Sequence, residues 1–224
     1  MTQAVFLTGH SGGSGKTFCN VNLAIMFASA GQRVLLADLD PLCGSMAFWG
    51  DLQQAERLES IQRHSVRPGL DLVMGLEAED VPELYELLEE QYDIWMFDTG
   101  APLDPALQPV YGLCRDVILL LQNEPLNFRT LPLFVEKLLE QKLVRAEQLR
   151  GLLLNCRERF LSLQHPAGQL EEILGKYLLP FDVPFSPLAD RALLEQKTAI
   201  EFAGLDSDLG WAFRQLANIL GVRA

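Results

Sequence analysis

Short apolar runs alternate along this chain with longer stretches that carry apolar residues at helical spacing. Residues 117–121 are apolar at every position, and residues 4–8 are apolar at four of five. A strand with two apolar faces is buried on both, which is typical of a parallel sheet between two layers of helices. We therefore predict an α/β fold of three layers, with a mostly parallel central sheet and helices on both faces. Strands are predicted at residues 4–8, 33–37, 70–74, 92–97, 117–121, 149–154 and within 178–184, and helices at 16–30, 81–91, 126–141, 166–177, 189–197 and 208–220.

The sequence contains no internal repeat, low-complexity tract or Gly/Ser linker, so residues 1–224 are expected to form a single domain. No apolar run reaches the roughly 18 residues that a membrane span needs. The start of the chain lacks the basic segment of a signal peptide, and the four cysteines form no C-x-x-C pair. We expect a cytoplasmic protein with reduced thiols.

A glycine-rich loop separates the first predicted strand from the first predicted helix. Its glycines allow backbone N–H groups to point inward at a phosphate, and the start of the helix adds partial positive charge. Lys16 is suited to the β- and γ-phosphates of a nucleotide, and the Thr17 hydroxyl to Mg²⁺. The strict P-loop pattern requires glycine where this chain has His10, so the match is to a variant, G-G-x-G-K-T. The alternative is a glycine-rich turn with an incidental lysine. The predicted nucleotide-binding residues of this segment are Ser11, Gly12, Gly13, Ser14, Gly15, Lys16, Thr17 and Phe18.

Four further polar residues follow predicted strands. Asp38 and Asp40 come after residues 33–37, Asp98 after 92–97 and Asn155 after 149–154. Ligands of parallel sheets bind at the carboxyl ends of strands, so these side chains are expected to meet the glycine loop at one edge. The alternative readings are a solvated turn for the aspartate pair, an ordinary strand-to-loop turn at Asp98 and a strand-end cap at Asn155.

The glycine loop, the sequence Asp38-Leu39-Asp40-Pro41 and the strand ending at Asp98 resemble the ParA/MinD family of deviant-Walker ATPases. All three motifs appear in the family's order, and the helix at residues 212–220 is similar to the family's last helix. This resemblance implies a P-loop fold that binds ATP and Mg²⁺ and hydrolyses ATP slowly, with stimulation by a partner. It also implies a nucleotide-dependent homodimer.

The resemblance assigns roles to the residues at the strand ends. Lys16 and Asp40 are implied to be catalytic, with Asp40 orienting the attacking water. Asp38 is implied to lie near the magnesium shell, while Asp98 holds Mg²⁺ through water and Thr17 binds it. Asn155 is implied to read the adenine amino group, and Pro184 belongs to a segment that packs against the base. The guanine-reading pattern N-K-x-D is absent, which favours ATP over GTP.

The family's signature lysine falls at Ser11. In the family, that lysine reaches the partner's phosphates across a sandwich dimer, which a serine is too short and uncharged to do. Three outcomes stay open: the sandwich dimer does not form, it forms but hydrolyses slowly, or another lysine such as Lys137 or Lys142 replaces it. Some family members that position carboxysomes are similar in lacking this lysine.

The charge of the chain constrains its partners. Residues 1–112 hold 5 Lys and Arg against 16 Asp and Glu, whereas residues 113–224 hold 13 against 14. Strong nucleic-acid binding needs a concentrated basic face, so nonspecific DNA remains possible only through the arginines of the second half. The alternative is that these arginines pair with neighbouring glutamates. The last helix has few cations, and we expect core packing rather than membrane attachment.

Three functions are compatible with these residues. The leading one is an ATP-driven switch that positions or partitions a cargo, such as a plasmid, a chromosome, a protein compartment or a polar assembly, through dimerisation and a partner protein or cargo adaptor. The second is an ATP-binding scaffold that hydrolyses poorly. The third is an ATP-dependent metabolic enzyme of the dethiobiotin synthetase type, against which the D-x-D-P motif counts.

Overall fold

A computed structural model describes residues 2–9, 13–42, 44–49, 56–58, 61–100, 102–122, 125–157 and 177–222. Within this part, one sheet has nine strands in the order β3-β4-β5-β2-β6-β1-β7-β8-β9. From β5 to β9 all neighbours are parallel, while β4 runs antiparallel to both β3 and β5. The strands are β1 (Gln3–Thr8), β2 (Val34–Asp38), β3 (Glu56–Leu58), β4 (Ile61–Arg67), β5 (Leu70–Met74), β6 (Ile94–Asp98), β7 (Asp116–Gln122), β8 (Leu149–Arg157) and β9 (Leu178–Pro184).

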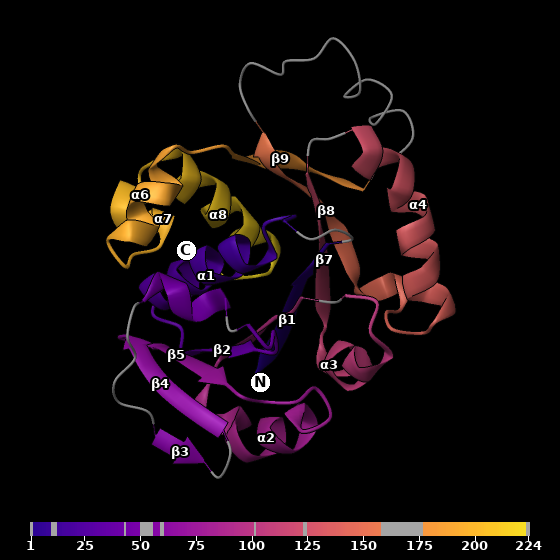
Figure 1. Cartoon of the computed structure of the whole chain (residues 1–224), viewed down its shortest axis with the longest axis horizontal. Coiled ribbons are helices and arrows are strands. Elements are labelled where there is room, and N and C mark those ends of the chain that lie inside the picture. The colour runs from indigo at the N-terminus through magenta and orange to yellow at the C-terminus, as the bar shows by residue number, and fades with distance from the viewer. Residues whose placement is uncertain are drawn as a thin grey trace.

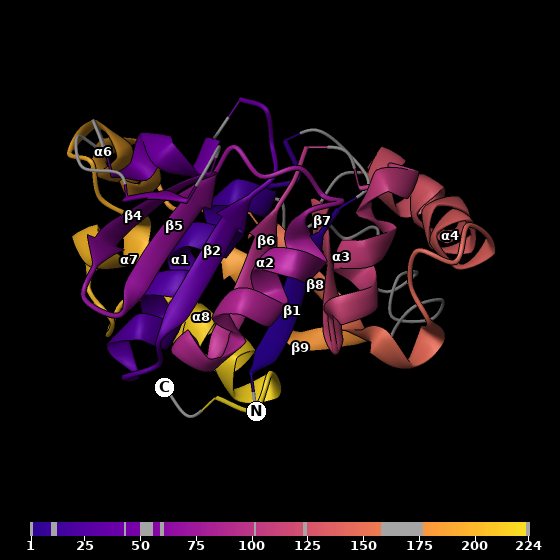
Figure 2. The same ribbon diagram turned by 90° about the horizontal axis from the view of Figure 1, so that it is seen from below.

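Helices cover both faces of this sheet, which confirms the predicted three layers (Figures 1 and 2). They are α1 (Lys16–Ser29), α2 (Val81–Leu88), α3 (Gln108–Leu113), α4 (Pro125–Glu140), α6 (Leu188–Leu194), α7 (Ala199–Ala203) and α8 (Asp208–Ile219). Successive residues of a strand face opposite sides, so Val5 and Leu7 join a core with α1, α7 and α8, while Ala4 and Phe6 join a second core with α2, α3 and α4. Among the described helices, none is long and apolar enough to cross a membrane.

The predicted strands are all present, whereas the strands β3 and β4 and the helices α3 and α7 were missed, and β3 has only three residues. β4 was not predicted because it is partly polar and carries its buried residues at only some positions, with His64 and Val66 facing inward. The helices α3 and α7 are six and five residues long, too short to show a helical period. The helix predicted over residues 81–91 is shorter, because α2 ends at Leu88 and a 3₁₀ turn, Glu89–Gln91, follows. The helix predicted over 166–177 lies, apart from Tyr177, outside the described residues.

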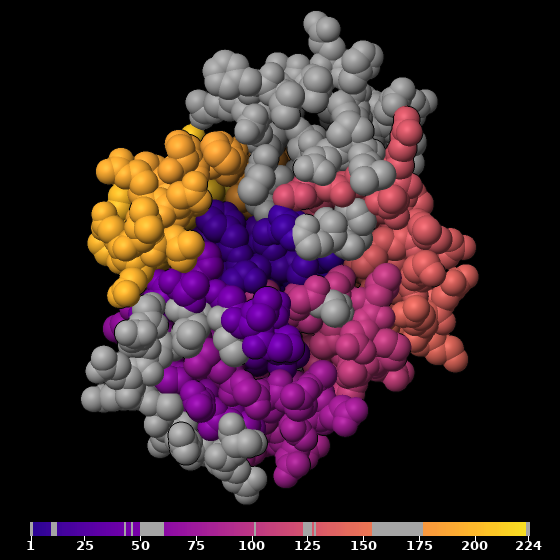
Figure 3. Space-filling model, in the orientation of Figure 1, coloured from indigo at the N-terminus to yellow at the C-terminus, as the bar shows by residue number. Residues whose placement is uncertain are grey.

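The parallel strands end at the edge from which the loops leading to the helices depart. In the space-filling view, the N-terminal part of the chain, in indigo, lies in the middle of the visible face (Figure 3). It is flanked by the orange C-terminal segment on one side and by the magenta middle of the chain on the other. This arrangement brings residues far apart in the sequence around the start of α1.

Candidate functional site

The glycine loop joins β1 directly to α1. Gly13 and Gly15 have φ angles of +76° and +83°, a left-handed conformation that favours glycine. A Cβ atom at Gly13 would meet nothing within 4 Å, so the backbone angle rather than crowding requires glycine there. No side chain caps the start of α1, and its first turn has no acidic residue. The predicted residues Ser11 and Gly12 lie outside the described part, as does His10, where the chain departs from the strict P-loop pattern.

Lys16 extends from the first position of α1 into the interior, where only 7% of the residue is exposed. Burial lowers the pKa of its ammonium group, while the charges of Asp98 and Asp40 act in the opposite direction. The lysine is therefore close enough to both predicted carboxylates to interact with their charges. A phosphate group placed among these residues would meet a buried ammonium group whose positive charge favours an anion.

Asp38 and Asp98 form a buried acidic pair. They are aligned on the neighbouring parallel strands β2 and β6, with exposures of 1% and 0%. Burial, followed by the charge of Asp98, raises the pKa of Asp38 to about 6. Burial also raises the pKa of Asp98, and hydrogen bonds from Thr17 and Asn20 oppose this shift. Two carboxylates held together beside a threonine hydroxyl provide oxygen atoms of the kind that Mg²⁺ prefers.

Ser45 connects the two carboxylates, and the sequence analysis missed it. It lies in the 3₁₀ turn Gly44–Phe48, where its backbone N–H donates to Asp38 Oδ2 at 2.9 Å and its hydroxyl donates to Asp98 Oδ2 at 3.1 Å. Asn20 Nδ2 donates to the other oxygen of Asp98 at 3.1 Å. Asn20 follows Lys16 by four residues, so helical spacing could have found it. A serine in a turn gives no comparable signal.

Asp40 connects the loops that follow β2 and β6. Its Oδ1 accepts a hydrogen bond from the backbone N–H of Leu42 at 3.0 Å. A Cβ atom added to Gly100 would lie 2.8 Å from its Oδ2, so the carboxylate packs directly on the Gly100 backbone. The two loops are therefore in direct contact through this carboxylate.

The glycine loop and the aspartates at the strand ends lie within a segment that matches a known family of nucleotide-binding domains. Residues 5–200 match the model of the CobQ/CobB/MinD/ParA nucleotide binding domain. The chain belongs to this family. The match includes the glycine loop, Asp38, Asp40, Asp98 and the strands that hold them in place.

Curated relatives of this nucleotide-binding domain are similar over part of their length. A putative tyrosine-protein kinase EpsB of Ralstonia nicotianae is 35% identical over 115 residues, which are 42% of this chain and 15% of EpsB. The chromosome-partitioning ATPase Soj of Thermus thermophilus is 30% identical over 138 residues, 54% of this chain and 55% of Soj. The chain thus spans about half of Soj and a smaller part of EpsB.

Solved structures share the fold over nearly the whole chain. A ParA family ATPase from Chlorobium tepidum has a TM-score of 0.82 at 16% identity, covering 97% of this chain and 99% of that one. The septum site-determining protein MinD of Pyrococcus horikoshii, solved with Mg-ADP, has a TM-score of 0.78 at 18% identity and coverage of 100% and 99%. The ADP- and magnesium-bound cobyrinic acid a,c-diamide synthase of Mycobacterium smegmatis scores 0.71 at 20% identity, with 98% and 94% covered.

The strands β7, β8 and β9 continue the same sheet beyond β1, so their carboxyl ends lie along the same edge as the glycine loop. Asn155 is aligned with Gln122 of β7 and with Val183 of β9, one residue before Pro184, although its side chain lies outside the described part. Gln122, which the sequence analysis missed, donates from Nε2 to the Gly13 carbonyl at 2.5 Å. The ring of Phe18 packs near that of Phe213 of α8, with 6.2 Å between centroids, so it is directed at the core.

The described residues include no group of three or more His, Cys, Asp or Glu side chains that could hold a metal ion. The donor set does fit a magnesium ion that comes with its own phosphate oxygens, because the Thr17 hydroxyl is hydrogen-bonded to Asp98 and Asp98 is aligned with Asp38 on the neighbouring strand. Mg²⁺ typically keeps several waters and is bound through one or two carboxylates plus substrate phosphates.

The acidic pair predicts how the stability of the metal-free protein depends on pH. The raised pKa of Asp38 means that the folded state holds the proton of this carboxyl group more tightly than the unfolded state does. The contribution of this proton to the free energy of unfolding is therefore fully present below about pH 4 and is lost as the pH rises through 6. Replacing Asp38 with asparagine should therefore stabilise the magnesium-free protein at pH 7, by up to about 3 kcal/mol, and leave it unchanged near pH 4. Urea unfolding in EDTA at pH 4, 5, 6 and 7 measures this difference; a difference that shrinks as the pH rises would contradict it.

Proposed function

We propose that this chain binds Mg·ATP and hydrolyses it as a ParA-like switch, whose nucleotide state controls dimerisation and contacts with a partner that positions or partitions a cargo. The observation that carries this proposal is the connection of Lys16 and Thr17 on α1 to Asp38 and Asp98 at the ends of β2 and β6. The loops after both strands meet at Asp40 and Gly100. Mg-ADP in the MinD neighbour supports the same ligands here.

The roles of the residues follow from their chemistry. The backbone amides of residues 13–17 and the Lys16 ammonium group hold the β- and γ-phosphates. Thr17 and Asp98 would hold Mg²⁺, and the ion would supply positive charge that neutralises the charge developing on the phosphates. Asp40 orients a water whose oxygen forms the new bond to the γ-phosphorus as the bond to the ADP oxygen breaks, and the water's proton leaves toward the Asp40 carboxylate. Asn155 and Pro184 hold the base.

Dimerisation is proposed to use the edge that carries these loops. Leu42, directly after Asp40-Pro41, is 87% exposed, and an exposed apolar side chain at this edge suits a protein contact. Neither Lys137 nor Lys142 fits the role of the missing signature lysine in such a dimer. Helix α4 begins after the carboxyl end of β7 and returns toward the start of β8, so Lys137 in its last turn and Lys142 after it lie toward the opposite edge of the sheet.

DNA and membrane are not part of this proposal. Arg145, Arg150 and Arg214 are engaged with Glu147, Asp116 and Asp206 at 2.9, 2.7 and 4.0 Å. One of these partners is a neighbouring glutamate, as the alternative reading expects, and the other two are aspartates. In α8, the apolar residues Leu209, Phe213 and Leu216 are buried in the core with α1, which leaves little apolar face for a bilayer.

Light scattering of the purified protein with Mg²⁺ and either ADP or a slowly hydrolysed ATP analogue tests the switch. We expect a monomer with ADP and a doubling of mass with the analogue. A nucleotide can shift the protein from monomer to dimer only if it binds the dimer more tightly than the monomer, and this difference in affinity is proposed for ATP and not for ADP. A monomer in both conditions, with tight ATP binding and no hydrolysis, would indicate the scaffold instead. Turnover that depends on a small carboxylic acid would indicate a metabolic enzyme.

A further inference from the structure

The carboxylate of Asp98 is held by hydrogen bonds on both of its oxygen atoms. Oδ1 accepts a hydrogen bond from Asn20 Nδ2 at 3.1 Å, and Oδ2 accepts one from the Ser45 hydroxyl at 3.1 Å. The Thr17 hydroxyl is hydrogen-bonded to the same carboxylate. An ionised carboxylate offers about four acceptor positions, so these three donors leave about one for a metal ion or for a water that the ion carries.

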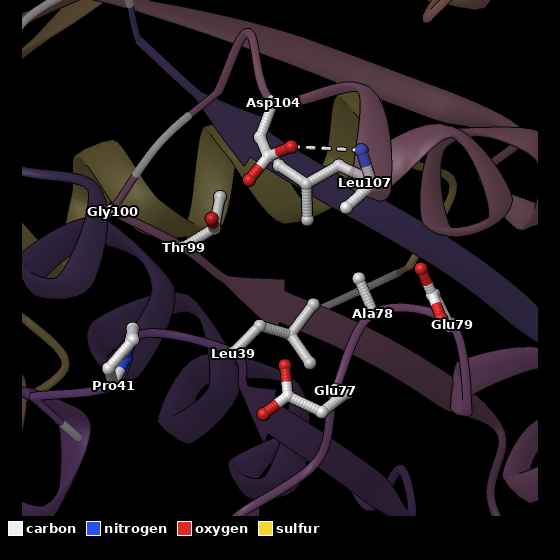
Figure 4. A pocket seen from close by; sticks show the side chains of 10 residues that line it. Leu39, Pro41, Glu77, Ala78, Glu79, Thr99, Gly100, Asp104 and Leu107 are labelled. Atoms are coloured by element: carbon white, nitrogen blue, oxygen red, sulfur yellow. Dashed lines mark hydrogen bonds between the residues drawn. The ribbon is translucent and has the colours of Figure 1, made fainter.

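The backbone of Asp98 is also held in place. Asp98 is the last residue of β6, which pairs with β2, and its carbonyl accepts a hydrogen bond from the Leu39 N–H at 2.9 Å. Figure 4 shows the loops that follow these two strands side by side, with Leu39 on one and Thr99 and Gly100 on the other. Rotation of the side chain is therefore the main freedom left to this carboxylate, and each of its hydrogen bonds opposes that rotation.

Asn20 uses only half of its hydrogen-bonding capacity. It is 0% exposed, and among the described residues its Oδ1 has no hydrogen-bond partner, which destabilises the folded state. Asn22, further along the same helix, is equally buried but has both ends paired. Its Nδ2 donates to the Phe18 carbonyl at 2.8 Å, and its Oδ1 accepts from the Ile200 N–H at 2.9 Å. Asn22 therefore has a structural role that Asn20 lacks, and the contact of the Asn20 amide is with Asp98.

Magnesium and calcium ions place different demands on such a carboxylate. Mg²⁺ demands near-ideal octahedral geometry and usually keeps several waters, whereas Ca²⁺ takes more oxygen ligands in flexible geometry and binds carboxylates through one oxygen or both. Because Asn20 and Ser45 already donate to the two oxygens of Asp98, this carboxylate presents one fixed direction. That arrangement suits Mg²⁺ and disfavours the binding of Ca²⁺ through both oxygens.

We propose that Asn20 determines which metal ion accompanies the nucleotide: by fixing Asp98 in one orientation, it favours Mg²⁺ over Ca²⁺. Asn20 acts through Asp98 and is a positioning residue. The inference rests on the proposed function, because it concerns the ion that binds together with the nucleotide phosphates, and it names the residue that selects this ion. Ser45 holds the other oxygen of Asp98 but also donates to Asp38 through its backbone N–H, so Asn20 gives the cleaner test.

The experiment measures binding and involves no hydrolysis. Titration calorimetry gives the Kd of ADP for the whole chain in Mg²⁺, in Ca²⁺ and in EDTA, and the ratio of each metal value to the EDTA value measures what that ion contributes. We expect Mg²⁺ to contribute more than Ca²⁺ in the wild-type protein. In Asn20→Ala the contribution of Mg²⁺ should fall about 10-fold and that of Ca²⁺ less than about threefold, while the Kd in EDTA stays within about twofold.

Asn22→Ala is the matched control, because it removes an equally buried asparagine from the same helix. It leaves the Ile200 N–H without its acceptor, so its melting temperature should fall by about 4 °C or more while the preference for Mg²⁺ is unchanged. Asn20→Leu, which has a similar branched shape but no donor, is measured in parallel and should lose the preference as Asn20→Ala does. Thermal unfolding without nucleotide checks that each variant is folded.

Three results would overturn the inference: equal contributions of Mg²⁺ and Ca²⁺ in the wild-type protein, equal weakening with both ions in the Asn20 variants, or the same loss of preference in Asn22→Ala. The second result would show that Asn20 supports the site in general and does not select the ion. A wild-type protein that binds no ADP under any of the three conditions would contradict the proposed function itself, so the two failures are recognised separately.

Discussion

Replacing Lys16 with alanine should lower the affinity for Mg·ATP at least 100-fold. The reason is electrostatic: Lys16 is the only Lys or Arg in the first 32 residues, and it lies in a buried position beside Asp98 and Asp40. Without its ammonium group, the phosphates would enter a pocket whose remaining side-chain charges are negative. Removing one partner of a buried charge pair typically costs about 2–5 kcal/mol, and 100-fold corresponds to about 3 kcal/mol. Titration calorimetry with ATP and Mg²⁺ measures the change.

Lys142→Ala is the matched control for this experiment. It removes the same charge from an exposed residue at the opposite edge of the sheet, so its ATP affinity should stay within twofold of the wild-type value. Thermal unfolding without nucleotide checks that both variants are folded. If Lys16→Ala binds ATP as tightly as the wild-type protein does, the glycine loop is not the nucleotide site and the proposed function fails with it.

The central strands could be predicted from sequence because a strand that is buried on both faces is an unbroken run of apolar residues. The strand at residues 117–121 is apolar throughout, and β6 is apolar up to its last residue, Asp98, since helices cover both strands on both sides. β4 has no such apolar run, because exposed and buried positions mix along it and the polar residues Arg63, His64 and Ser65 stand in its centre. Its place is set by pairing with β5 across the turn at Gly69, whose φ is +77°.

The candidate site was predictable as far as it depends on where strands end, and not where it depends on the order of the strands in the sheet. Asp38, Asp40 and Asp98 stand at the ends of apolar runs, and any parallel sheet brings such ends to one edge. Ser45 and Gln122 were missed because their contacts depend on which strands are neighbours and in what register. Ser45 reaches Asp98 only because Asp38 and Asp98 are aligned on adjacent strands. These two aspartates are 60 positions apart in the chain, and the sequence does not show that their strands are neighbours.

Replacing Asp40 with alanine should leave nucleotide binding within threefold of the wild-type value and lower kcat for hydrolysis roughly 100-fold, the lower end of the range for a positioned proton acceptor. Lys16, Thr17, Asp38 and Asp98 remain in place in this variant, so the phosphate and magnesium contacts are retained. What is lost is the carboxylate beside Gly100 and the hydrogen bond that it accepts from Leu42. Phosphate release under saturating ATP, together with calorimetric binding, distinguishes the two effects.

Gly100→Ala tests the same carboxylate without altering it chemically. The new Cβ would lie 2.8 Å from Asp40 Oδ2, closer than Cβ contacts allow, and the carboxylate is the more easily displaced partner because it ends a flexible side chain. Hydrolysis should therefore fall about 10-fold while ATP affinity and thermal stability stay near wild type, since general acid–base steps depend on hydrogen-bond geometry. Gly112→Ala is the control, because a Cβ there meets nothing within 4 Å. Full activity in both Asp40→Ala and Gly100→Ala would show that water is oriented by another group, and equal losses in Gly100→Ala and Gly112→Ala would trace the effect to backbone changes rather than to Asp40.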